Sequence, residues 1–180
     1  MAALVGYTNS GKSTLLNSLS SAGVLAKNEM FSTLDPTTRK INLPGNHTIL
    51  LTDTVGFIRK LPPTLMNAFR ATLEELTEAD LMLHVIDINS HNADRQYSTV
   101  EDILKDMNIE NIPRISVFNK IDLLFDQKEQ LDGAEALKYI EDKIGEPAAD
   151  AVLVSAEKRW GLDNLLNKIN EYKSVIESVR

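Results

Sequence analysis

The chain has 180 residues, of which 43% are hydrophobic and 25% are charged, which predicts a folded domain with a complete core rather than a disordered chain. Its net charge of −7 argues against a stand-alone nucleic-acid binder, because phosphate contacts need a basic excess. The absence of cysteine excludes disulfide bonds, thiolate nucleophiles and cysteine-ligated metals, and the three histidines offer no zinc spacing.

The first half of the chain alternates short apolar runs with helical patterns. Ala3 to Val5 predict a strand, and Ser13 to Leu19 follow with their leucines on one helical face. Residues 39–43 and 48–52 flank the turn cluster Pro-Gly-Asn-His, so we expect an antiparallel hairpin there. After two prolines, a helix is expected from Thr64 to about Ala79, with Thr64 as its cap.

The second half continues the alternation. Leu81 to Ile86 form a continuous apolar run, as expected for a central parallel strand covered on both faces. We expect further strands at residues 114–118 and 151–154, and helices at residues 93–107, 133–144 and 162–179. This order predicts an α/β fold with a mostly parallel six-stranded sheet, one antiparallel hairpin and helices on both faces.

The whole chain is expected to form one domain, residues 1–180, because no repeat or linker divides it. The chain begins almost within a strand, which suggests a domain excised from a longer protein. The apolar start is too short for a signal peptide or a membrane span, so no membrane association is expected. We expect a monomer, since no heptad repeat or unpaired apolar stripe remains once helices cover the sheet.

A phosphate-binding loop is predicted at Gly6 to Ser13, which match GxxxxGK[ST] between a predicted strand and a predicted helix. In such a loop, backbone amides and the helix N-terminus attract phosphate. Lys12 would contact the outer phosphates and the Ser13 hydroxyl would bind Mg²⁺. The alternative is a glycine-rich turn with an exposed lysine. The nucleotide-binding residues expected here are Asn9, Ser10, Gly11, Lys12, Ser13 and Thr14.

A base-selecting motif follows the strand at residues 114–118, where the chain reads Asn119-Lys120-Ile121-Asp122. The Asp122 carboxylate can accept hydrogen bonds from guanine N1 and N2, which adenine cannot donate. Because an unpaired buried carboxylate is costly, the wrong base would be rejected. The alternative is a solvated loop. Ser155 and Ala156 follow the last strand, where a backbone amide could meet the guanine carbonyl oxygen.

Two further segments are candidates for sensing the third phosphate. Asp53-Thr54-Val55-Gly56 ends a predicted strand, so that Asp53 could hold Mg²⁺ through water and the Gly56 amide could bond the γ-phosphate. Upstream, Asp35-Pro36-Thr37-Thr38-Arg39 offers threonine hydroxyls for the same metal. Spacing alone does not decide between the two threonines, and a strand-end turn and a solvated loop are the simpler interpretations.

The order of these motifs resembles that of translation-factor-related GTPases. Residues 6–13, 33–39, 53–59 and 68–75 together look like the GTP-binding domain of the HflX-type, Obg-related GTPases. The resemblance implies a three-layer Ras-like P-loop domain, Thr37 as the metal-binding threonine, and a cytoplasmic protein associated with the large ribosomal subunit. The N-terminal domain and helical linker of that family are missing from this sequence, and Glu157 stands where a lysine is commoner.

Hydrolysis would have to proceed without the glutamine that many small GTPases carry after the D-x-x-G glycine, since Phe57 stands there. The expected catalytic residues are Lys12, Thr37, Gly56 and Asn9. In several related GTPases an asparagine at the place of Asn9 helps bind K⁺, although a simple loop hydrogen bond explains it equally well. We expect slow turnover, about 10⁻⁴ to 10⁻² per second, raised by a partner or K⁺.

Other functional readings remain open. The chain could be a guanine-nucleotide-dependent module that binds the ribosome or another partner with negligible hydrolysis, or an ATP-using enzyme with a chance N-K-I-D. Arg59 and Arg70 could reach phosphate, but solvated arginines are the simpler interpretation. His84 is expected in the core and Trp160 at an apolar edge near the base pocket.

Overall fold

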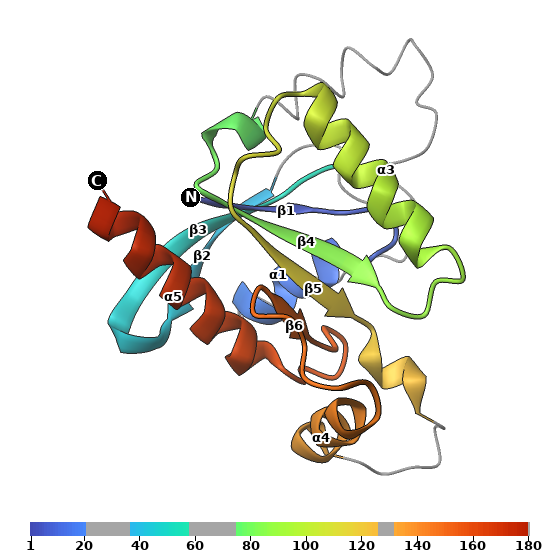
Figure 1. Cartoon of the computed structure of the whole chain (residues 1–180). Coiled ribbons are helices and arrows are strands. Elements are labelled where there is room, and N and C mark those ends of the chain that lie inside the picture. The colour runs from blue at the N-terminus through green and yellow to red at the C-terminus, as the bar shows by residue number, and fades with distance from the viewer. Residues whose placement is uncertain (21–36, 58–74, 126–131, 180) are drawn as a thin grey trace.

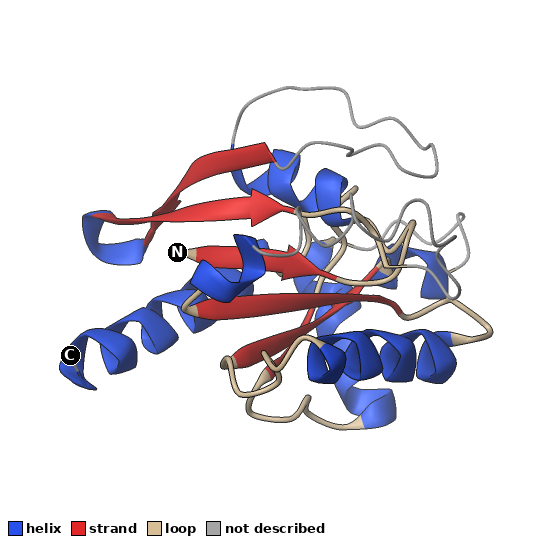
Figure 2. Cartoon of the chain, turned by 90° about the horizontal axis from the view of Figure 1, so that it is seen from above, coloured by secondary structure: helices blue, strands red, loops and turns tan. Residues whose placement is uncertain are grey.

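A computed structural model of the chain describes residues 1–20, 37–57, 75–125 and 132–179. Helices lie on both sides of a central sheet, as the two orthogonal views show (Figures 1 and 2). The strands are β1 Ala2–Val5, β2 Thr37–Leu43, β3 His47–Asp53, β4 Leu81–Asp87, β5 Arg114–Asn119 and β6 Ala151–Leu153. The α-helices are α1 Lys12–Ser20, α3 Ala93–Asp106, α4 Gly133–Ile144 and α5 Leu162–Val179.

The six strands pair in the order β2-β3-β1-β4-β5-β6. Only the β2–β3 pair is antiparallel, and the four other pairs are parallel. This confirms the predicted sheet, with β1 near its middle. The loops that follow β1, β3, β5 and β6 therefore emerge at the carboxyl edge of the sheet, where ligands bind in open α/β folds.

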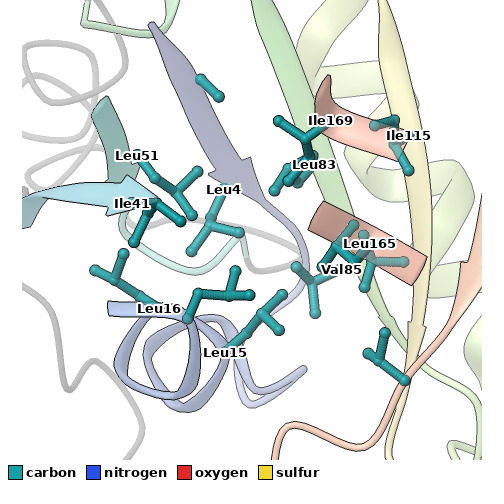
Figure 3. Close-up of a cluster of buried hydrophobic side chains, with 14 of the residues drawn as sticks. Leu4, Leu15, Leu16, Ile41, Leu51, Leu83, Val85, Ile115, Leu165 and Ile169 are labelled. Carbon is teal, nitrogen blue, oxygen red and sulfur yellow. The ribbon is translucent and has the colours of Figure 1, made fainter. Parts of the chain in front are cut away.

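Two apolar cores lie on opposite faces of the sheet because neighbouring strand residues point to opposite sides. Leu4 and Leu83 face the α1 and α5 side, where they meet Leu15 and Leu165 (Figure 3). On the other face, the core is formed by Ala3, Val5, Phe57, Met82, Val100 and Leu104, the last two from α3. The central strands are thus covered on both faces, as their continuous apolar sequence predicts.

The observed element boundaries differ from the predicted ones by a few residues at most. The hairpin strands are longer than expected and are joined by a 3-10 turn, Pro44–Asn46. The helix predicted from Thr64 lies mostly outside the described residues, and its end, Glu75–Glu78, is a 3-10 helix. The structure adds one short element that the sequence analysis missed, the 3-10 helix Ile121–Leu124 within the N-K-I-D loop. Among the described helices, none is long and apolar enough to cross a membrane.

Candidate functional site

The GxxxxGKS loop joins β1 to α1, as predicted. Gly11 has a φ of +96°, and a side chain there would collide with the amide nitrogen of Asn119. Its carbonyl accepts the Leu15 amide, 2.9 Å away, which begins the helix. Glycine is therefore required at this position both by the backbone conformation and by the close approach of the base-selecting loop.

Lys12 is buried beneath this loop. Its ammonium donates to the carbonyls of Gly6 and Tyr7, at 3.2 and 3.3 Å. Burial lowers the pKa of Lys12 to about 8, and the Asp53 carboxylate partly offsets this effect by raising it. An anion arriving at the loop would restore the favourable environment of the charged amine, so the site is electrostatically suited to phosphate.

The predicted metal ligands meet between α1 and β3. The Ser13 hydroxyl donates to Asp53 Oδ2, 2.5 Å away, and Asp53 is buried. Thr37 is the cross-strand neighbour of Asp53 in the β2–β3 ladder, although its side chain is exposed. Hydroxyl and carboxylate oxygens are the donors that Mg²⁺ prefers, so this set fits the ion. Among the described residues, no three or more His, Cys, Asp or Glu side chains gather in a group that could hold a metal ion.

The D-x-x-G segment is bound to the phosphate loop through its backbone. The Phe57 amide donates to the Gly6 carbonyl at 3.0 Å, and the Thr8 amide donates to the Phe57 carbonyl at 2.8 Å. Gly56 packs so closely that a Cβ would lie 2.7 Å from Thr8 Cα and 3.1 Å from Lys12 Nζ. The Phe57 ring is fully buried, so it points into the core and away from any substrate.

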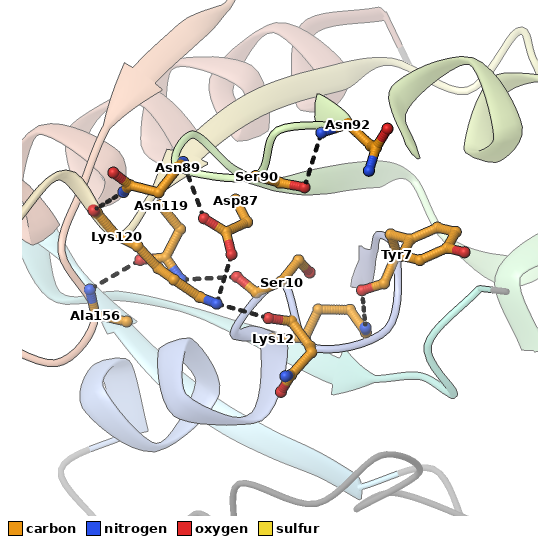
Figure 4. A network of polar contacts seen from close by, with 11 residues as sticks. Tyr7, Ser10, Lys12, Asp87, Asn89, Ser90, Asn92, Asn119, Lys120 and Ala156 are labelled. Atoms are coloured by element: carbon orange, nitrogen blue, oxygen red, sulfur yellow. Dashed lines mark hydrogen bonds and ion pairs between the residues drawn. The ribbon is translucent and has the colours of Figure 1, made fainter. Parts of the chain in front are cut away.

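The base-selecting loop is tied to two other loops by one side chain, Asn119, which is 1% exposed. Its amide nitrogen donates to the Ser10 carbonyl, and its amide oxygen accepts the Ala156 amide, each at 3.0 Å (Figure 4). Buried Ser155 accepts the Lys158 amide and fixes the turn after β6. The structure thus brings the phosphate loop, N-K-I-D and Ser-Ala together.

Asp122 lies at the first turn of the 3-10 helix after β5 and is half-buried. Thr14, also half-buried, lies in the first turn of α1. Trp160 contacts Phe125 edge to face, with ring centroids 6.3 Å apart, in the apolar cluster beside the N-K-I-D loop, as expected. Arg59, Arg70 and residues 33–36 lie outside the described residues.

Two polar residues at the end of β4, Asp87 and Asn89, were missed by the sequence analysis. Asp87 Oδ2 lies 2.6 Å from the Lys120 ammonium, and the Asn89 side chain donates to the Lys120 carbonyl at 2.6 Å (Figure 4). A D-x-N pattern at the carboxyl end of a strand, with N-K-x-D ending another strand, is the signal that could have indicated them.

The comparisons with known proteins agree with this geometry. A family model described as "50S ribosome-binding GTPase" matches residues 1–120. GTPase HflX of Caldanaerobacter subterraneus subsp. tengcongensis is 46% identical over 93% of this chain and 35% of that protein. GTPase HflX of Escherichia coli is 40% identical over 93% of this chain and 37% of that protein. The chain therefore spans about a third of the length of these curated relatives.

Solved structures show the same fold. A GTP-binding protein from Sulfolobus solfataricus, in complex with GDP, matches with a TM-score of 0.71 at 31% identity, over 97% of this chain and 52% of that one. A variant of Era from Aquifex aeolicus bound to GDP.AlF4⁻ matches with a TM-score of 0.72 at 29% identity, over 95% and 56%. The fold is thus that of the Ras-like P-loop GTPases. Sequence and site together show that the chain belongs to the family of 50S ribosome-binding GTPases and is similar to part of the proteins named GTPase HflX.

Proposed function

We propose that this domain binds GTP with Mg²⁺ and hydrolyses it to GDP and phosphate, acting as a molecular switch. One observation carries the proposal: the loops after β1, β3, β5 and β6 converge, and the buried Asn119 carboxamide joins three of them. A phosphate loop alone would serve ATP or GTP, whereas the attached N-K-I-D loop provides the carboxylate that selects guanine.

The phosphate end of the nucleotide would lie along residues 9–14. Backbone amides at the start of α1 donate to phosphate oxygens, and the buried Lys12 ammonium, now bonded to the loop carbonyls, turns to the outer phosphates. The Gly56 amide contacts the γ-phosphate, because the Phe57–Gly6 and Thr8–Phe57 bonds hold this segment against the loop. Asp122 accepts the guanine N–H groups, with Ser155 and Ala156 completing the base pocket.

Ser13, Thr37 and Asp53 are proposed as the residues that hold Mg²⁺. Ser13 and Asp53 already lie within hydrogen-bonding distance, and the sheet register places Thr37 opposite Asp53. When bound, the ion would neutralise charge on the β- and γ-phosphates. Ser13 contributes its hydroxyl, and Asp53 acts through water.

Hydrolysis then depends on groups other than a glutamine, because the residue after Gly56 is the buried Phe57. We propose that Lys12, Thr37 and the Gly56 amide stabilise the reacting phosphate, and that Asn9 helps bind K⁺ near it. Asn9 has a φ of +65°, a left-handed backbone conformation that is uncommon for residues other than glycine.

Phe57 also favours a second candidate function. With no side chain to orient water at that position, the domain could act as a guanine-nucleotide-dependent binding module with negligible hydrolysis. In the full-length protein, we propose a cytoplasmic location and binding to the large ribosomal subunit. The family's description as a 50S ribosome-binding GTPase supports the ribosome contact. We propose that the domain alone is a monomer.

Competition binding with Mg²⁺ present tests nucleotide choice. GTP and GDP should displace a fluorescent guanine nucleotide, ATP should not, and Asp122→Asn should weaken GTP binding and favour xanthine nucleotides. Equal competition by ATP would refute the assignment. Single-turnover hydrolysis then separates the switch from the module: tight GTP binding without phosphate release would favour the module. Equal rates in potassium and sodium buffers would remove the K⁺ role of Asn9.

A further inference from the structure

Lys120 of the N-K-I-D loop is held at both ends by residues from the end of β4. Its ammonium lies 2.6 Å from Asp87 Oδ2, and its carbonyl accepts the Asn89 side-chain amide at 2.6 Å. Asp87 Oδ1 in turn accepts the backbone amide of Asn89 at 3.0 Å. Each oxygen of the Asp87 carboxylate therefore supports one end of the same lysine, directly or through Asn89.

The held lysine reaches across to the phosphate loop. Its ammonium donates to the Asn9 carbonyl at 2.8 Å. Both residues that this bond joins have left-handed backbones, with φ of +68° at Lys120 and +65° at Asn9. This conformation is uncommon for residues other than glycine, although Asn adopts it more readily than most. The bond joins the N-K-I-D loop directly to the phosphate loop at these two turns.

The ion pair between Lys120 and Asp87 is partly shielded from solvent, since these side chains are 29% and 19% exposed. A charge-assisted hydrogen bond in such a place is stronger than a surface ion pair. Without the carboxylate, the ammonium would be free to leave Asn9 for water.

We propose that Asp87 is a positioning residue for nucleotide binding, which acts by holding Lys120 on the Asn9 carbonyl and so slows nucleotide release. This inference rests on the proposed function. Asp87 acts where the loops meet, and not at the third phosphate, so it should slow the release of GDP and GTP by the same factor.

The test is the dissociation rate of fluorescent GDP and GTP analogues from the purified chain. Asp87→Asn should raise both rates about tenfold, because the amide keeps the side-chain size but has no charge and only one acceptor oxygen for the two donors that the carboxylate now binds. Asp102→Asn is the matched control: it removes the same charge from an exposed position on α3 and should leave both rates unchanged.

A double-mutant cycle separates positioning from a general structural effect. In a Lys120→Met background, Asp87→Asn should change the rates less than about twofold, since the group it positions is gone. An equal effect of Asp87→Asn in both backgrounds, or no effect in the chain that keeps Lys120, overturns the inference. If Asp87→Asn does not fold, Asn89→Ala tests the other end of Lys120: faster release supports the inference and an unchanged rate overturns it.

Failure of the proposed function would look different. If the unaltered chain binds no guanine nucleotide, the proposed function itself is wrong. If it binds GDP selectively while Asp87→Asn releases GDP at the unaltered rate, only the role of Asp87 is refuted.

Discussion

Acid should destabilise this domain through one buried histidine. His84 lies in β4, 2% exposed, with its ring stacked on Tyr97 of α3 at a centroid distance of 4.8 Å. Burial, with Arg114 and Lys12 nearby, lowers the pKa of His84 to about 4. Glu101 Oε1 lies 3.7 Å from His84 Nδ1, which is too long for a hydrogen bond. Both oxygens of the Glu101 carboxylate instead accept from the Arg114 guanidinium, each at 2.9 Å.

The sign and size of the effect follow from the two states of the chain. Between pH 6.5 and 4 the unfolded chain binds a proton at His84 that the folded domain does not, so the free energy of unfolding falls as the pH falls. The loss approaches about 3.4 kcal/mol at full protonation and is about 2 kcal/mol at pH 5. Well above pH 6.5 the histidine is neutral in both states and contributes no pH dependence.

Urea unfolding of the chain and of His84→Phe, measured at pH 8, 6 and 5, tests this. The phenyl ring keeps an aromatic partner for Tyr97 but cannot bind a proton. Between pH 8 and 5 the unaltered chain should lose about 2 kcal/mol more than the variant. His91→Phe, at an exposed position, should keep the original dependence. Parallel curves for the chain and His84→Phe would refute the reasoning, and a smaller acid loss in the chain than in the variant would mean that Glu101 pairs with a charged His84.

Three further outcomes are expected. GDP affinity should be constant between about pH 7 and 8, where the phosphates are ionised, and should fall about tenfold per pH unit above pH 8 until guanine itself loses a proton, because the proposed phosphate contact requires the charged Lys12 amine. Lys12→Arg should remove this slope, and a persistent slope would contradict the reasoning. Asp132→Ala should cost about 1 kcal/mol in urea unfolding, because Asp132 and Glu135 form a capping box at the start of α4, and an unchanged midpoint would exclude that contribution. Gly161→Ala should lower the free energy of unfolding more than Gly145→Ala, because φ is positive at both positions but only at Gly161 would a Cβ collide with the last carbonyl of β6. Equal losses of unfolding free energy in the two variants would refute the collision.

The local elements and the phosphate loop could be predicted from sequence because their signals are local. Helical spacing in residues 162–179 and the GxxxxGKS pattern each need only a short stretch of chain. The D-x-x-E capping box at Asp132 is equally local and was overlooked. The contacts of Asp87 and the bridge between Tyr7 and Phe57 join segments far apart in the chain, and no periodicity reveals such pairs. They follow only from the order of strands in the sheet.

The burial of Phe57 has a mechanical consequence. Gly56 lies against the phosphate loop, and the next side chain is packed under α3 with Leu76, Val100 and Leu104. A backbone movement at Gly56 would therefore also displace the Phe57 ring, and the side chains packed around that ring would have to shift with it. If Gly56 contacts the γ-phosphate as proposed, a displacement there would reach α3 through the Phe57 ring, and a partner bound to α3 would oppose or favour the same displacement.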